Sequence, residues 1–324
     1  MTTSQQNITY LILGLIIGYV TNEAYNKFIT GKYITSNNKQ IKHGIEDLIG
    51  NTPMVLIKSL SEATGCKILA KAEYLNPGGS PKDRVALGLI LSAEKSKLIR
   101  PHSNYTIYEG TVGSTGISLA LICKSRGYQC YIVMPDDMAI EKYQSLLSLG
   151  AIVEKVRPAS IVDPGHFVNI ARKRAQKDPF GYFVDQFENL DNLKVHKKST
   201  GPEIMEQTKG EIHGFVAGAG TGGTLAGVSS YLKSQNSNII TVLADPQGSG
   251  LHNKVQFDTL YTSVLAEGTR TRHQIDTLVE GIGLTRLTKN FNQALNTIDL
   301  STKVSDQQAV DMSRWLMEKD GNFI

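Results

Sequence analysis

The chain presents one lysine at the end of a glycine-rich turn, where an apolar helical pattern begins. Residues 76–84 read NPGGSPKDR, so Lys82 stands directly at the start of the predicted helix. A lysine that is held at one angle and partly desolvated is nucleophilic at neutral pH and suits Schiff-base chemistry. We therefore predict that Lys82 is the catalytic residue. Asp83 and Arg84, which follow it, are interpreted as structural residues of the helix start and of a domain contact.

A second glycine-rich turn carries several hydroxyl groups. Residues 109–116 read EGTVGSTG and lie between the apolar run YTIY and another helical pattern. Backbone N–H groups at a helix start have no partner inside the helix, and the helix dipole adds to their attraction for an anion. An ordinary helix cap needs one hydroxyl, whereas this turn offers those of Thr111, Ser114 and Thr115. The pattern predicts a site for a carboxylate or a phosphate.

A third turn, at residues 218–224, reads GAGTGGT and again joins an apolar run to a helical pattern. It contains the G-x-G-x-x-G spacing, and Asp245 ends the next predicted strand, so a dinucleotide-dependent oxidoreductase is one interpretation. Thr221 and Thr224 instead place hydroxyls where a loop can surround a phosphate monoester. A nicotinamide site would also leave the other two turns without a role. One phosphate site, one carboxylate site and one lysine together favour pyridoxal 5′-phosphate as the cofactor.

Short β-branched runs alternate with stretches of helical length along the chain. This alternation predicts an α/β fold with parallel sheets covered by helices on both faces. In such sheets ligands bind at the carboxyl ends of the strands, in the turns that lead into helices. The predicted strands are 105–108, 130–134, 151–156, 213–217 and 239–244, and the predicted helices include 114–126, 139–149 and 222–233.

Composition argues against several classes of function. A net charge of +4 over 324 residues, without a basic block, gives no reason to expect a nucleic-acid partner. Cys66, Cys123 and Cys130 have no C-x-x-C spacing and are interpreted as reduced. The seven histidines show no H-E-x-x-H pairing, so no metal site is predicted. Trp315 lies in a helical pattern and is expected in the core.

The first 43 residues are expected to form a membrane anchor followed by a polar tether. Residues 8–20 read ITYLILGLIIGYV without a charge, and lysines follow them. With its uncharged flanks, the run approaches the ~20 residues that span a bilayer. The flanks lack the features of a cleaved signal, and the lysines place the rest of the chain on the cytosolic side. A buried or interfacial helix is the alternative interpretation of this segment.

Taken together, several motifs resemble the cysteine synthase and cystathionine β-synthase family of fold-type II pyridoxal-phosphate enzymes. The resemblance runs from about Gly44 to the C-terminus and includes the three turns described above. With the N-terminal segment, the chain is similar to a membrane-anchored mitochondrial branch of the cysteine synthases. That branch implies the mitochondrial outer membrane, with the catalytic region facing the cytosol. The further motifs are NTP at 51–53, QFEN at 186–189, TGPE at 200–203 and EGIG at 280–283.

The resemblance implies a role for each matching residue. Lys82 would hold the cofactor as an internal aldimine and later move the α-proton of the substrate. The phosphate of the cofactor would be held by Gly220, Thr221, Gly222, Gly223 and Thr224. The carboxylate of the substrate would be held by Thr111, Ser114, Thr115 and Gln186. Ser114 would also face the ring hydroxyl of the cofactor.

The implied fold has two parallel-sheet domains of the tryptophan synthase β-like type, with the cofactor between them. The catalytic region would span residues 44–324, and the smaller domain, about 85–184, would be inserted in the larger. The implied reaction is a β-replacement that forms L-cysteine from O-acetylserine or serine and sulfide through an aminoacrylate intermediate. Two half-reactions of this kind predict ping-pong kinetics. Family members are commonly homodimers, so a homodimer is expected.

Departures from the family pattern support a second hypothesis, a catalytically impaired relative with weak cofactor binding. Ser114 stands where the family usually has asparagine, and Val112 where it usually has serine. The loss of one hydroxyl from the carboxylate site would cost on the order of 1 kcal/mol. The sequence also ends at Ile324, ahead of the family's closing segment and its serine for the pyridine nitrogen, so a truncated product and a degenerate relative both remain open. Cystathionine synthesis is less favoured, because no heme-binding cysteine precedes the catalytic pattern.

Overall fold

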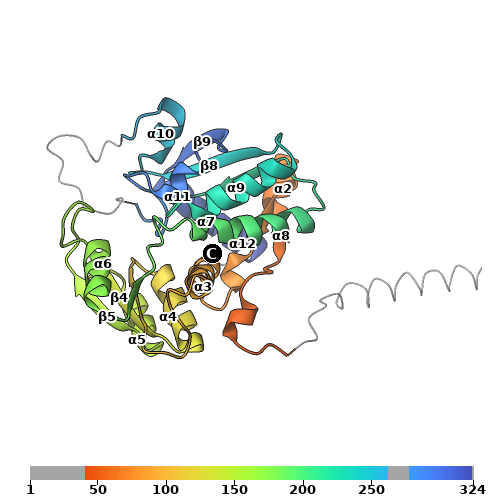
Figure 1. Cartoon of the computed structure of the whole chain (residues 1–324). Coiled ribbons are helices and arrows are strands. Elements are labelled where there is room, and N and C mark those ends of the chain that lie inside the picture. The colour runs from red at the N-terminus through yellow and green to blue at the C-terminus, as the bar shows by residue number, and fades with distance from the viewer. Residues whose placement is uncertain (1–40, 262–276, 323–324) are drawn as a thin grey trace, which may run out of the picture. The chain divides into compact units, whose positions relative to one another are not determined.

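The computed structural model describes residues 41–261 and 277–322 (Figure 1). Residues from Gly44 onward form one compact unit. Its strands are β1 (Met54–Leu56), β2 (Leu69–Lys71), β3 (Thr106–Gly110), β4 (Gln129–Pro135), β5 (Ile152–Val156), β6 (Gly181–Phe183), β7 (Gly214–Ala217), β8 (Ile240–Pro246) and β9 (Leu300–Val304). Its helices are η1 (Ile45–Leu48), α2 (Lys58–Thr64), η2 (Glu73–Leu75), α3 (Lys82–Lys95), α4 (Ser114–Arg126), α5 (Ile140–Ser148), α6 (Phe167–Lys177), α7 (Asp191–Lys198), α8 (Thr200–Gln207), α9 (Gly223–Gln235), α10 (Leu251–Phe257), α11 (Lys289–Asn292) and α12 (Asp306–Asp320).

Four parallel strands form the first sheet, in the order β5-β4-β3-β6. Successive side chains of a strand point to opposite faces, and those of β4 pack against helices on both faces. Cys130, Ile132 and Met134 pack into a core with α3, α4 and α5. Tyr131 and Val133 pack against α6 on the other face. Helices therefore cover both faces of this sheet, as Figure 1 shows around β4 and β5.

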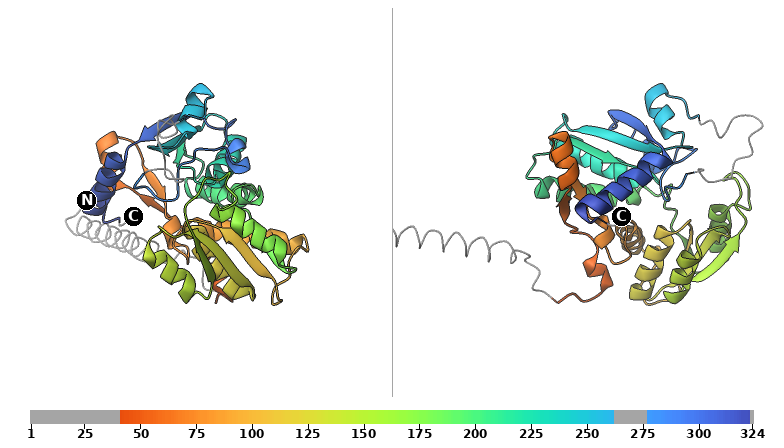
Figure 2. Two further views of the ribbon diagram at one scale, coloured as in Figure 1. Left: turned by 90° about the vertical axis from the view of Figure 1, so that its left-hand side faces the viewer. Right: turned by 180° about the vertical axis from the view of Figure 1, so that it is seen from behind.

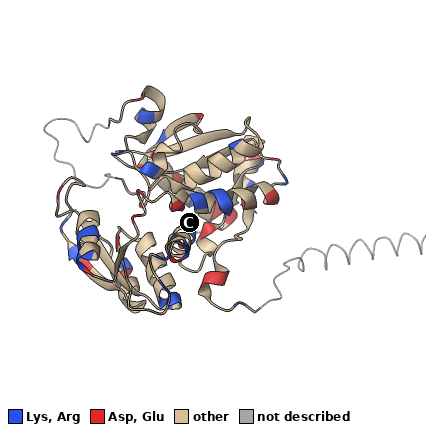
Figure 3. Cartoon of the chain, viewed as in Figure 1, with Lys and Arg blue, Asp and Glu red and all other residues tan. Residues whose placement is uncertain are grey.

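Three parallel strands form the second sheet, in the order β7-β8-β9. Leu243 of β8 is fully buried and packs with Leu225 of α9, Leu251 of α10 and Phe291 of α11. The helices around both sheets carry charges of both signs (Figure 3). One example is Arg174 of α6, which pairs with Glu154 of β5 at 2.8 Å. The strand β7 ends directly before the Gly220 turn, so the sheet holds that turn in place.

Helix α3 connects the two sheets. It packs against α4 of the first sheet and against α7, which in turn packs on α9 of the second. Figure 1 shows α3 end-on between the sheets, and the view from behind agrees (Figure 2). Its buried side chains include Val85, Leu89 and Ile90, which join the core of the first sheet. Because Lys82 is the first residue of α3, its position depends on contacts with both sheets.

The predicted α/β fold with parallel sheets is confirmed. The five predicted strands and three predicted helices all occur, with ends that differ by at most two residues. The proposed insertion of a smaller domain at 85–184 stays a prediction. The placement of Trp315 in the core is wrong, because its side chain is 42% exposed and its Nε1 donates a hydrogen bond to Ser59 Oγ at 2.8 Å.

The predicted location in the mitochondrial outer membrane is corrected by the structure. Within residues 41–261 and 277–322, no helix is long and apolar enough to cross a bilayer. The segment predicted to be the anchor, residues 8–20, lies outside the described residues.

Candidate active site

A cavity of about 390 Å³ lies where the turns after β3, β4, β6 and β7 meet the start of α3. Parallel strands bring their carboxyl ends to one edge of a sheet, so residues of different turns gather there. Of the site residues predicted from the sequence, the cavity is lined by Lys82, Thr111, Ser114, Thr115, Gln186, Gly220 and Thr221. The other three, Gly222, Gly223 and Thr224, belong to the same turn as Gly220 but do not line the cavity.

Lys82 reaches the cavity as an amine without a partner. Its backbone N–H donates to Ser80 Oγ at 3.2 Å, which holds the start of α3. Within the described part of the chain, its Nζ forms no hydrogen bond or ion pair, and desolvation by burial lowers the pKa of Lys82. A lowered pKa raises the fraction of neutral amine, the form that attacks a carbonyl. The geometry therefore suits Schiff-base chemistry at this residue.

Hydrogen bonds of two side chains hold the turn before Lys82 in place. The Asp83 carboxylate accepts hydrogen bonds from the backbone N–H of Gly78 and from the hydroxyl of Ser118. Asn76 accepts the backbone N–H of Gly50 at 2.9 Å and donates to a backbone carbonyl oxygen of η2 at 2.8 Å. These contacts support the structural role predicted for Asp83. They fix the backbone that presents the lysine.

The turn after β3 joins residues from two distant motifs. Thr115 donates its hydroxyl proton to Gln186 Oε1 at 2.6 Å, and both side chains are buried. Thr111 Oγ1 accepts the N–H of Gly113 at 3.3 Å. The Ser114 side chain is exposed to the cavity. No side chain caps α4 here, so the N–H groups of its first two residues are available to an anion.

The glycines of the third turn are required by close packing. A Cβ on Gly220 would lie 2.1 Å from the carbonyl oxygen of Gly281, and one on Gly223 would lie 2.0 Å from Asn192 Oδ1. Gly222 has a φ of +86°, in the left-handed region that favours glycine. It precedes α9, whose first turn has no side-chain cap. The turn therefore offers unpaired N–H groups on a close-packed backbone, which suits a phosphate.

The two threonines of this turn are oriented by buried neighbours. Thr221 Oγ1 accepts a hydrogen bond from Asn192 Nδ2 at 2.9 Å. Thr224 Oγ1 lies 3.1 Å from Nε2 of His196, whose Nδ1 lies 2.9 Å from Thr200 Oγ1. Desolvation lowers the pKa of the fully buried His196 to about 3, so its ring is neutral at neutral pH. No sequence motif marks His196 as part of the site.

The acid that a dinucleotide site would require is not available to a ligand. Asp245 is 0% exposed and accepts the backbone N–H of His252 at 2.8 Å. It is absent from the lining of the cavity, which lies within the described residues. Gly218, the first glycine of the G-x-G-x-x-G spacing, serves packing, because a Cβ there would lie 2.8 Å from Ile282. These observations count against the dinucleotide interpretation.

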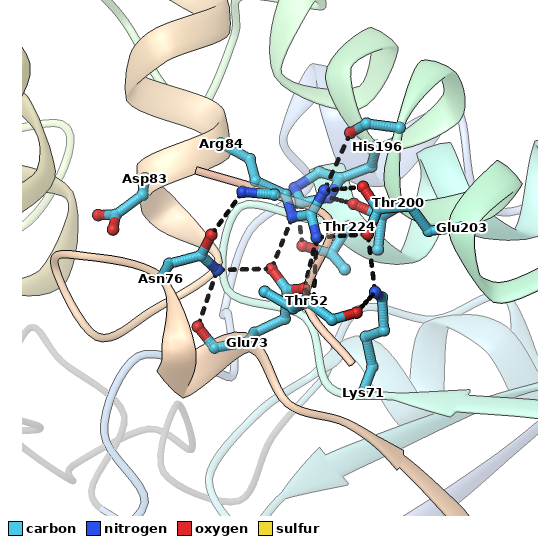
Figure 4. Close-up of polar contacts among 12 residues, drawn as sticks. Thr52, Lys71, Glu73, Asn76, Asp83, Arg84, His196, Thr200, Glu203 and Thr224 are labelled. Carbon is cyan, nitrogen blue, oxygen red and sulfur yellow. Dashed lines mark hydrogen bonds and ion pairs between the residues drawn. The ribbon is translucent and has the colours of Figure 1, made fainter. Parts of the chain in front are cut away.

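A buried ion-pair network lies beside the lysine turn (Figure 4). Arg84 pairs with Glu73 at 2.8 Å and with Glu203 at 2.6 Å, and it also donates to Thr52 Oγ1 at 3.1 Å. Lys71 pairs with Glu203 at 2.7 Å. The network joins the first turn of α3 to β2, η2 and α8. These contacts support the structural role predicted for Arg84. Its partners were not predicted from the sequence.

Two further ion pairs at the cavity were not predicted from the sequence. Lys142 of α5 pairs with Glu280, and both residues line the cavity. Arg286, another lining residue, pairs with Glu188 at 2.6 Å and lies over the ring of Phe187. Both carboxylates belong to motifs that carry the family resemblance. Their basic partners stand elsewhere in the chain and have no local signature.

Comparison with known protein families matches residues 45–324 to the family described as "Pyridoxal-phosphate dependent enzyme". The match covers most of the chain and all the predicted site residues. The chain belongs to this family. Pyridoxal phosphate, the cofactor predicted from the three turns, is confirmed by the same match. The residues at the cavity fit this group, because they offer a free amine, a hydroxyl-rich turn and a close-packed glycine turn with unpaired N–H groups.

Named relatives support the resemblance to cysteine synthases. A protein of Neurospora crassa named "Cysteine synthase 2" is 58% identical over 290 residues, which is 86% of this chain and 64% of that protein. A protein of the same name in Schizosaccharomyces pombe is 50% identical over 321 residues, 97% of this chain and 81% of that protein. The chain thus spans less than two thirds of the length of the first relative and about four fifths of the second.

A solved structure shares the fold. The crystal structure of O-ureido-L-serine synthase superposes with a TM-score of 0.74 at 29% sequence identity. The superposition covers 87% of this chain and 82% of the other. The fold of this chain is therefore shared with O-ureido-L-serine synthase.

Proposed function

We propose that the protein is a pyridoxal-phosphate-dependent cysteine synthase that forms L-cysteine from O-acetylserine or serine and sulfide. The observation that carries the proposal is one cavity lined by an unpaired, partly desolvated Lys82, by the Thr111 turn and by the Gly220 turn. The two relatives named above support the choice of product.

Lys82 has two tasks in this proposal. Its Nζ would hold the cofactor and, once free again, would accept the proton from the substrate Cα. When bound, pyridoxal phosphate supplies an electron sink that stabilises the charge left on that carbon. The lowered pKa of Lys82 favours a neutral amine that can accept a proton at neutral pH. The hydrogen bonds of Asp83 and the Arg84 network hold the backbone that presents this amine.

The Thr111 turn and Gln186 would bind the substrate carboxylate. The N–H groups at the start of α4 and the Ser114 hydroxyl face the cavity, where they can donate to carboxylate oxygens. Thr115 donates to Gln186 Oε1, so it sets the orientation of the Gln186 amide in addition to lining the cavity. These contacts would orient the substrate through its carboxylate.

The turn from Gly220 to Thr224 would bind the cofactor phosphate. The first turn of α9 supplies N–H donors, and its dipole favours the negative charge. The Thr224 hydroxyl can donate to a phosphate oxygen only if Nε2–H of His196 donates to Thr224. The neutral ring must then accept the Thr200 hydroxyl proton at Nδ1, which the 2.9 Å contact allows.

The homodimer implied by the family resemblance is also part of this proposal. Light scattering of the purified protein measures its oligomeric state.

The experiment compares the full chain with Lys82→Ala. Each protein is incubated with pyridoxal phosphate, its visible absorbance is recorded, and cysteine is measured after addition of O-acetylserine and sulfide. We expect a lysine-dependent absorbance band and cysteine formation in the wild type, and neither in Lys82→Ala. A band without cysteine would identify the impaired relative, whereas a band that survives in Lys82→Ala would refute the assignment of the lysine.

A further inference from the structure

A lysine of α5 lies at the edge of the proposed carboxylate site and has no role in the function proposed above. Lys142 lines the cavity, and its side chain is 23% exposed. Its stem and its amine lie against Gly113, the residue that precedes α4. A Cβ on Gly113 would lie 3.0 Å from Lys142 Cδ and 3.2 Å from its Nζ. The glycine therefore lets the ammonium group approach the start of α4, whose first two N–H groups are available to an anion.

The ion-pair partner of Lys142 is a carboxylate on a fixed backbone. Among the described residues, Glu280 pairs with Lys142 alone, and both line the cavity. The turn that carries Glu280 is held beside the Gly220 turn, because the N–H of Gly283 donates to the carbonyl oxygen of Ala219 at 2.8 Å. The Glu280 side chain itself is 60% exposed. Its carboxylate can therefore turn from Lys142 to solvent while the backbone stays in place.

A substrate carboxylate can replace Glu280 on this lysine. The two groups are chemically alike, so they compete for the same ammonium. An ion pair between partly exposed side chains contributes little net stability, and its loss costs correspondingly little. A substrate carboxylate at the start of α4 would also accept the free N–H groups there, and charge-assisted hydrogen bonds of this kind are strong. The exchange therefore favours the substrate.

The arginine at the cavity is held more firmly than Lys142. Arg286 pairs with Glu188 at 2.6 Å, and both side chains are mostly buried. Glu188 also accepts the backbone N–H of Lys289 at 2.9 Å. The guanidinium group of Arg286 lies over the ring of Phe187 as well. Of the two paired cations that line the cavity, Lys142 is thus the one whose partner is readily exchanged.

We propose that Lys142 is a further binding residue for the carboxylate of the amino-acid substrate, and that this carboxylate replaces Glu280 as its partner. In the complex, the substrate carboxylate lies between the start of α4 and the Lys142 ammonium, and Glu280 turns to solvent. The proposal rests on the proposed function, in which the Thr111 turn and Gln186 bind the same carboxylate. It makes Lys142 and Glu280 determinants of specificity, because a neutral analogue of the substrate gains nothing from the exchange.

Substitutions of the two residues should change kcat/KM for O-acetylserine in opposite directions. Lys142→Met keeps a stem against Gly113 but removes the charge, so kcat/KM should fall about three- to tenfold. Glu280→Gln removes the competing carboxylate and should raise kcat/KM by up to about fivefold. In the double variant Lys142→Met/Glu280→Gln this gain should disappear, because no ammonium group is left to be released.

The matched control is Asp137→Asn. Asp137 lines the same cavity but is not the partner of Lys142, so its variant removes one negative charge without releasing the lysine. The proposal is supported if Glu280→Gln gains more than Asp137→Asn and if Lys142→Met abolishes that gain. It is overturned if the two gains are equal, if the gain persists in the double variant, or if Lys142→Met alone leaves kcat/KM unchanged. Circular dichroism verifies that each variant is folded.

Binding of butyrate separates this proposal from the proposed function, because butyrate has a carboxylate but no reactive amine. Broadening of its methyl signal in proton NMR gives dissociation constants for the same five proteins incubated with pyridoxal phosphate, and butyramide is the neutral match. We expect Glu280→Gln to bind butyrate more tightly, butyramide unchanged, and the double variant to lose the gain. This result in a protein that forms no cysteine would refute only the function. Equal butyrate constants in all five proteins would refute the role of Lys142 even if the enzyme is active.

Discussion

Replacing Arg84 should reveal how strongly the network beside the lysine turn stabilises the fold. Its side chain is 2% exposed and pairs with Glu73 and Glu203 at 2.8 and 2.6 Å. Arg84→Met would keep much of the buried volume but leave two glutamates in a nearly dry site, with Lys71 as the remaining cation for one of them. Breaking a buried ion pair by removing one partner costs about 3–5 kcal/mol. We expect a loss of this size in the free energy of unfolding at pH 7.

The loss should depend on pH in a defined direction. Burial opposes ionisation of Glu203, yet its bonds to Arg84 and Lys71 lower its pKa to about 2, and the pKa of Glu73 is lowered in the same way. A depressed acid contributes stability above its unfolded value of 4.5, and that stability is lost as pH falls through the folded value. Without Arg84, burial would raise both pKa values. The deficit of Arg84→Met should therefore be largest near neutral pH and shrink toward pH 4.

Urea unfolding of the cofactor-free protein, followed by circular dichroism at pH 4.5, 6 and 7.5, measures this deficit. The matched control is Arg174→Met, because Arg174 pairs with Glu154 at 2.8 Å but is 49% exposed. An exposed pair contributes about 0–1 kcal/mol, so the control should change little at any pH. The reasoning fails if Arg84→Met costs no more than the control, or if its deficit does not vary with pH.

Two further substitutions test the turns. Gly220→Ala places a Cβ 2.1 Å from the carbonyl oxygen of Gly281, so backbone must move, and we expect cofactor affinity to fall by about tenfold or more. Absorbance titration measures this affinity, and the control is Gly214→Ala, whose Cβ meets nothing closer than 3.6 Å. Equal cofactor affinity in the wild type and both variants would show that the Gly220 turn does not hold the phosphate. Val112→Ser adds a hydroxyl at the cavity and should tighten binding of the amino-acid substrate. An unchanged dissociation constant would mean that this side chain does not face the substrate.

The elements that the sequence predicts well are those with local start and stop signals. The predicted helix 114–126 coincides with α4, which is preceded by Gly113 and followed by Gly127 at a φ of +69°. The prediction for Trp315 is wrong for the opposite reason. Helical spacing shows which side chains share a face, but it does not show whether another element covers that face. In α12, no residue is buried.

The site residues also divide into those that a local motif predicts and those that depend on long-range packing. The lysine turn and the two glycine turns can be predicted because each combines its chemistry and its geometry within nine residues or fewer. The Arg84 network cannot, since Arg84 and Glu203 are separated by 119 positions in the chain. The pairing of Thr115 with Gln186 spans 71 positions and is predicted only as a shared role implied by the family resemblance. Long-range partners depend on the packing of α3 between the two sheets.

Glu109 shows that part of this long-range information is present in the sequence. It directly follows the apolar run YTIY, which is predicted to be a buried strand. All five residues of β3 are buried, so an acid there has to be protonated, paired or hydrogen-bonded. The pattern therefore requires a partner for this acid. It does not supply the partner's identity, because Gln186 reaches Glu109 only through the parallel pairing of β3 with β6. A buried acid in a central strand is thus a local signal for a site that only the sheet topology completes.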